Sequence, residues 1–118
     1  ELIEDQFRRS LNTFIDVSLA WGVEPILMTQ FNRVNLEDEL FNKISSSMIN
    51  KEEYVESYVR LNDVIREVSA SRNVDLIDLA NLIPSSSNYM YDPVHLNENG
   101  SRLTAEILTE YWTEKLRL

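Results

Sequence analysis

The 118-residue chain has no cysteine and only two glycines. The lack of cysteine excludes disulfide bonds and thiolate metal sites, and it leaves the cellular compartment undetermined. The scarcity of glycine excludes the glycine-rich loops that cradle phosphate groups in nucleotide-binding proteins. No apolar run approaches the roughly eighteen residues of a membrane-spanning helix, so we expect no membrane span.

Basic residues are also few. Lysine and arginine together number 11 against 20 acidic residues, which gives a formal net charge of −9. A field of this sign repels the phosphate backbone of nucleic acids and the headgroups of anionic lipids. The basic residues are scattered, and Arg8 and Arg9 are the only adjacent pair. The sequence therefore argues against nucleic acid as a partner.

The overall composition is that of a globular protein, with 43% apolar and 26% charged residues. It predicts a single domain over residues 1–118 that is long enough to bury a core, and it excludes disorder. The sequence begins at Glu1, without an initiator methionine and within the approach to a helix. We therefore expect this domain to be partial, a fragment of a longer chain.

Three stretches have the spacing of amphipathic helices. Apolar residues recur at steps of three and four along residues 5–21 and 51–72. Gly22 follows the first of these stretches and is typical of the residue that ends a helix. A third helix is expected from about Asn97 to the end of the chain.

Two short apolar runs, at residues 26–29 and 74–79, predict buried strands. Between them, residues 31–50 predict an irregular segment with one or two helical turns, and residues 81–91 predict a loop. Strands that alternate with helices favour a parallel sheet covered on both faces. We therefore expect an α/β fold, a three-layer α/β/α arrangement. Two strands are too few for such a sheet, so it is a partial flavodoxin-like sheet whose N-terminal strands are missing.

The candidate chemistry centres on His95, the only histidine in the chain. Asp92 lies three residues earlier, a spacing that in a turn brings a carboxylate to the imidazole Nδ1. Such a carboxylate fixes the tautomer and stabilises the imidazolium that forms when histidine acts as a base. Pro93 disfavours a helix through Asp92 and predicts a defined loop. Taken alone, the pair is more typical of a surface hydrogen bond than of a catalytic dyad.

The residues around this pair form the pattern Asp92-x-Val94-His95-x-Asn97-x-x-Gly100, followed by a long amphipathic helix. This block resembles the last conserved block of the SGNH hydrolases, also called GDSL esterases and lipases. The order of helices and strands before it is also similar to that family. The resemblance implies a serine ester hydrolase in which His95 is the general base and Asp92 orients it, with no cofactor and no metal.

Other blocks of that family are absent. The family's nucleophile lies in a Gly-Asp-Ser motif and two further blocks build the oxyanion hole, but this chain has no Asp-Ser dipeptide and no glycine besides Gly22 and Gly100. We therefore expect the chain to be the C-terminal part of such an esterase, inactive on its own. The missing N-terminal half would be supplied in cis or as another chain, and an ester would be the substrate.

Three residues just before the pair, Tyr89, Met90 and Tyr91, either line a substrate pocket or pack the loop against the sheet. The acidic run at residues 37–39 is interpreted as a solvated surface rather than a metal site. An alternative from a different class is a non-catalytic α/β remnant. It would self-associate as a homo-oligomer through an open sheet edge, and Asp92 and His95 would then have no catalytic role.

Overall fold

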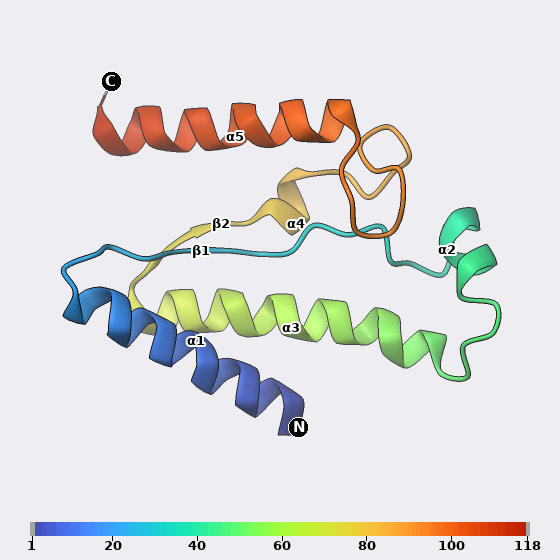
Figure 1. The fold of residues 1–118 in the computed structure, drawn as a ribbon, viewed down its shortest axis with the longest axis horizontal. Helices are drawn as coiled ribbons and strands as arrows, with labels where there is room; N and C mark the ends of the chain where they lie inside the picture. Colours follow the sequence, from blue (N-terminus) through green and yellow to red (C-terminus); the bar gives the residue numbers. More distant parts are fainter. Residues whose placement is uncertain (1, 118) are drawn as a thin grey trace.

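The computed structural model describes residues 2–117. Five helices and two strands follow one another in the order shown in Figure 1: α1 (Leu2–Ala20), β1 (Ile26–Met28), α2 (Glu39–Ile44), α3 (Lys51–Arg72), β2 (Asp75–Ile77), α4 (Leu79–Leu82) and α5 (Glu98–Leu116). The three long helices predicted from the apolar spacing are confirmed. The short helix α4 lies where the sequence predicts the end of a strand and the start of a loop.

Local sequence explains where the long helices begin and end. Gly22 follows α1 with a φ of 71°, a left-handed conformation that glycine adopts without steric cost. The C-cap of α3 is Asn73, also left-handed with a φ of 51°. Helix α5 begins after Asn97, whose side chain accepts a hydrogen bond from the N–H of Gly100. This cap anchors α5 directly behind the loop that carries His95.

The two strands pair in parallel, with Leu27 opposite Leu76. Figure 1 shows α1 and α3 on one side of the strands and α5 on the other. Leu27 packs with Ile15 of α1 and with buried valine and isoleucine side chains of α3. Ile77 packs in a second cluster that includes α4 and the inner face of α5. Each side of the sheet thus has its own apolar core.

The predicted three-layer α/β/α fold with a partial flavodoxin-like parallel sheet is wrong. The chain is mostly helical, and within residues 2–117 the only sheet consists of two strands of three residues each. The apolar run at 74–79 suggested a longer strand, but Leu79 and Ile83 are buried as parts of the α4 turn. Strand β1 ends at Met28. The next residue, Thr29, still donates its N–H to the carbonyl oxygen of Ile77, while its side chain bonds Asp78.

None of the helices in residues 2–117 combines the length and the apolar character needed to cross a membrane. The long helices carry charged residues along their exposed faces, and several of these form ion pairs with the neighbouring helix.

Candidate functional site

The Asp92 carboxylate holds His95 through both of its oxygens. Asp92 Oδ2 lies 2.7 Å from the imidazole Nδ1. Asp92 Oδ1 accepts hydrogen bonds of 2.8 Å from the backbone N–H groups of Val94 and His95. The carboxylate therefore fixes the backbone of the turn and the ring that the turn carries. The His95 side chain is 62% exposed.

The surrounding donors keep this carboxylate ionised. The backbone hydrogen bond from Val94 is the largest cause that lowers the pKa of Asp92. Burial opposes it, and the side chain and N–H of His95 lower the pKa further. An ionised carboxylate accepts the proton of Nδ1–H, which leaves the lone pair on Nε2. This is the tautomer that a histidine base needs to take a proton from a hydroxyl group.

Asn97 and Gly100 both contact the loop that carries His95. The Asn97 side chain donates hydrogen bonds to the carbonyl oxygens of Ser87 and Asn88 while it caps α5. Gly100 lies so close to the loop that a Cβ atom there would be 2.1 Å from the carbonyl oxygen of Tyr89. The spacing Asp92-x-x-His95-x-Asn97-x-x-Gly100 therefore has a physical reason at each named position.

The three residues proposed to line a substrate pocket have different environments. Met90 is fully buried. Tyr89 packs against the cluster between β2 and α5. Tyr91 is 62% exposed, and its ring stacks on the His95 imidazole with centroids 5.7 Å apart and planes 9° from parallel. Of the three side chains, Tyr91 is the one placed to meet a molecule that approaches His95.

Sequence reasoning missed Arg33, which ties the loop to the rest of the molecule. Its backbone N–H donates to the carbonyl oxygen of Pro93 at 2.7 Å, and its guanidinium donates to that of Met90 at 3.1 Å. Nε also pairs with Asp38 at 2.6 Å, and both side chains are about nine-tenths buried. The sequence carries no signal for these contacts, since Arg33 lies in an irregular segment that is 57 positions from Met90 in the sequence.

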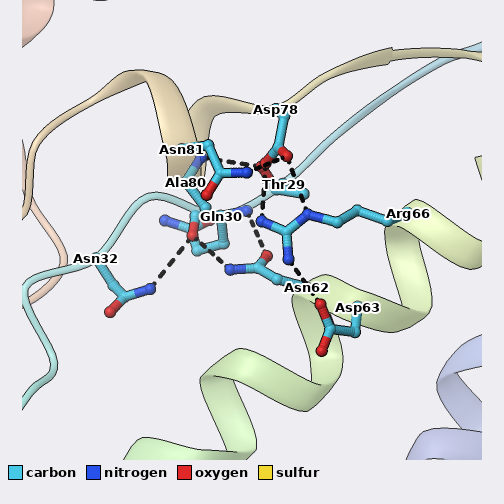
Figure 2. Close-up of polar contacts among 9 residues, drawn as sticks. All are labelled: Thr29, Gln30, Asn32, Asn62, Asp63, Arg66, Asp78, Ala80 and Asn81. Atoms are coloured by element: carbon cyan, nitrogen blue, oxygen red, sulfur yellow. Dashed lines mark hydrogen bonds and ion pairs between the residues drawn. The ribbon is translucent and has the colours of Figure 1, made fainter.

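A second polar cluster, the strand-end network, joins the ends of β1 and β2 to α3 (Figure 2). The buried hydroxyl of Thr29 donates to Asp78 at 2.6 Å and accepts from the N–H of Ala80 at 2.9 Å. The Arg66 guanidinium donates to both oxygens of Asp78. Asn62 of α3 exchanges two hydrogen bonds with the backbone of Gln30. The network fixes the point at which the chain leaves each strand.

The strand-end network predicts a loss of stability in acid. The hydrogen bond from Arg66 lowers the pKa of Asp78 against the opposing effect of burial, and Thr29 and Asn81 lower it further. The pKa of Asp78 in the folded state lies below its unfolded value of about 3.9. The stabilisation by the ionised Asp78 carboxylate is therefore fully present above about pH 3.9 and is lost as the pH falls through the folded-state pKa. Asp78→Asn should lower the free energy of unfolding by about 1–3 kcal/mol at pH 7.

Urea unfolding at a series of pH values checks this expectation. The difference in the free energy of unfolding between the Asp78→Asn variant and the native chain should become smaller as the solution becomes acidic. Asp5→Asn, at an exposed position of α1, serves as the control. A gap that stays the same from neutral pH down to pH values well below the usual range of aspartate would contradict the role given to Asp78.

Comparison of the chain with protein-family models, with curated proteins and with solved structures finds no match. Among the described residues, no group of three or more histidine, aspartate or glutamate side chains converges in a way that could hold a metal ion. Within residues 2–117, no serine hydroxyl forms a hydrogen bond with the His95 imidazole. Within the described residues, the geometry thus provides an imidazole oriented by Asp92 without a serine hydroxyl bonded to it.

Proposed function

We propose that Asp92 and His95 are the catalytic histidine–aspartate dyad of an SGNH-type serine ester hydrolase. Its nucleophile would be supplied by polypeptide outside these 118 residues. One observation carries the proposal. Asp92 binds Nδ1 at 2.7 Å with one oxygen and holds the turn with the other, so the imidazole is oriented on a side chain that is 62% exposed.

In the proposed reaction, Nε2 of His95 takes the proton of a serine hydroxyl while the serine oxygen attacks the carbonyl carbon of an ester. Asp92 stabilises the imidazolium that results. The proton then passes from Nε2 to the oxygen of the leaving alcohol, and the C–O bond of the ester breaks to leave an acyl-serine. Water, deprotonated by the same Nε2, attacks the acyl group, and the proton returns to the serine oxygen as the acid leaves.

The sequence lacks two parts of this machinery, the Gly-Asp-Ser block that carries the nucleophile and the blocks that build the oxyanion hole. Loss of a single oxyanion donor costs about a hundred- to a thousand-fold in rate. The isolated chain should therefore hydrolyse esters no faster than free imidazole does. The missing half, in cis or as another chain, brings both parts, and the substrate is a carboxylic ester with an acyl or acetyl group.

The test compares two proteins. One is the 118-residue chain, and the other is expressed from the same gene with the adjoining coding sequence included. The substrate is p-nitrophenyl acetate, and a fluorophosphonate probe labels any activated serine. We expect labelling and hydrolysis only in the longer protein. Rapid hydrolysis by the 118 residues alone, or a gene product with no serine that the probe labels, would contradict the proposed function.

A further inference from the structure

The segment of residues 90–95, which we call the dyad loop, carries both Asp92 and His95. Several of its hydrogen bonds are internal. Both oxygens of Asp92 bond within the loop, and the N–H of Tyr91 donates to the carbonyl oxygen of His95 at 3.2 Å. These bonds shape the loop without fixing its place on the molecule. Among residues 2–117, every hydrogen bond that joins the dyad loop to the chain before residue 86 comes from Arg33.

Arg33 attaches the dyad loop at two points, one on each side of Asp92. Its backbone N–H reaches the carbonyl oxygen of Pro93, and its guanidinium reaches that of Met90. One attachment would leave the loop free to swing about it, whereas two attachments fix both its place and its direction. Met90 is also fully buried, so little water competes with the guanidinium for that carbonyl oxygen.

Asp38 holds the guanidinium of Arg33 in turn. Its Oδ2 accepts from Nε at 2.6 Å, and its Oδ1 accepts from the N–H of Phe41 at 2.9 Å as the N-cap of α2. Burial raises the pKa of Asp38, but the N–H of Phe41 and the guanidinium of Arg33 outweigh that effect, and the net shift is downward. The carboxylate is therefore ionised at neutral pH, and its bond to Arg33 joins two charged groups.

The segment that carries Arg33 is itself fixed on both sides. Before it, Phe31 packs in the cluster between β2 and α5, and Gln30 exchanges two hydrogen bonds with Asn62 of α3 (Figure 2). After it, Val34 is buried. A continuous set of bonds therefore runs from α3 through this segment to the dyad loop.

The burial of the ion pair between Arg33 and Asp38 indicates a role other than stability. Taking two charges out of water can cost more free energy than their attraction supplies, so a buried pair is weak evidence for stabilisation. Every bonding partner described above for Arg33 lies within these 118 residues. Its role therefore needs no surface that another polypeptide covers. The pair provides a fixed position for the dyad loop.

We propose that Arg33 is a positioning residue for the dyad. Asp92 sets how the imidazole is turned within the dyad loop, and Arg33 sets where the loop stands relative to the strands. For its effect on catalysis, this inference rests on the proposed function. Nε2 of His95 must meet the serine hydroxyl at hydrogen-bond distance, and a displacement of about 1 Å can cost about a hundredfold in rate.

The test replaces both members of the ion pair, since removal of one would leave the other charge buried and unpaired. The variant is Arg33→Met together with Asp38→Asn. Methionine fills the space of the apolar stem of arginine, and asparagine still caps α2. The backbone N–H at position 33 keeps its bond to Pro93, so one of the two attachments is lost. Arg72→Met with Asp16→Asn is the matched control, because it removes a pair of the same residue types between α3 and α1.

In the 118-residue chain, nitrogen-15 relaxation should show lower order parameters for the backbone amides of Tyr91, Asp92 and His95 in the Arg33→Met/Asp38→Asn variant. The neutral imidazole should still carry its proton on Nδ1, because Asp92 is untouched. In the longer protein, kcat for p-nitrophenyl acetate should fall by about 10- to 100-fold with KM unchanged. The control variant should keep the native values in all three measurements.

Circular dichroism confirms that each variant is folded. A folded Arg33→Met/Asp38→Asn variant with native order parameters, or with native kcat, would overturn the inference and leave the proposed function in place. A native longer protein that neither hydrolyses the ester nor carries a serine labelled by the probe would instead contradict the proposed function, and the catalytic role of Arg33 with it. The activity of the native longer protein thus distinguishes the two failures.

Discussion

Alanine in place of Gly100 is expected to lower the free energy of unfolding by about 2–4 kcal/mol, one of the largest effects of any single substitution in this chain. The new Cβ would lie 2.1 Å from the carbonyl oxygen of Tyr89 and 2.8 Å from a methyl group of Leu96. The first contact is with backbone, which cannot rotate away. Either α5 or the loop must move, and His95 loses its support. Urea unfolding of the variant measures the loss.

Two control substitutions separate this crowding from general effects of alanine. Ser101→Ala, at the next and exposed position of α5, should change the free energy of unfolding by less than about 0.5 kcal/mol. Gly22→Ala meets no atom within 4 Å, but its φ of 71° is left-handed, so a cost of about 1–2 kcal/mol is expected from the backbone alone. A Gly100→Ala variant as stable as Ser101→Ala would show that α5 does not press against the loop in this way.

The second large effect concerns activity in the longer protein that the proposed function requires. His95→Gln removes the proposed base and should reduce kcat for p-nitrophenyl acetate by about 10²- to 10⁴-fold. Asp92→Asn should cause a loss of similar size, because an asparagine that donates to Nδ1 would stabilise the tautomer with its proton on Nε2. The double variant should be little worse than either single variant, since the two residues act as one unit.

Asp5→Asn is the matched control for these variants, because it also removes one carboxylate, from an exposed position of α1. It should leave kcat and the labelling rate unchanged. If His95→Gln retained full activity, or if the losses in the double variant simply multiplied, Asp92 and His95 would not be the base and its orienting group. Thermal unfolding of each variant ensures that activity is compared between folded proteins.

Local sequence was sufficient to predict the centre of the candidate site. The contact between Asp92 and His95 needs only a turn of three residues, and Pro93 favours such a turn. The cap at Asn97 is equally local, because its side chain bonds the N–H three residues later. The long helices could be predicted for the same reason, since their apolar spacing is a property of each segment alone.

Contacts between distant segments could not be predicted. Arg33 meets the carbonyl oxygen of Met90 across 57 positions of sequence, and Thr29 meets Asp78 across 49. These contacts depend on how the segments pack, which residue types alone do not encode. The same limit explains the error in fold class, because an apolar run at 74–79 does not reveal that its last residues enter a helix. Buried Met90 likewise has no local signal that distinguishes it from exposed Tyr91.

The most direct test of the central claim, that Asp92 orients His95 as a base, is the position of the imidazole proton. Nitrogen-15 NMR of the single histidine, at a pH where the ring is neutral, distinguishes the two tautomers. The 2.7 Å contact between Asp92 and Nδ1 predicts a proton on Nδ1 and a free lone pair on Nε2, with the preference lost in Asp92→Asn. A native chain whose neutral ring carries its proton on Nε2 would contradict the account.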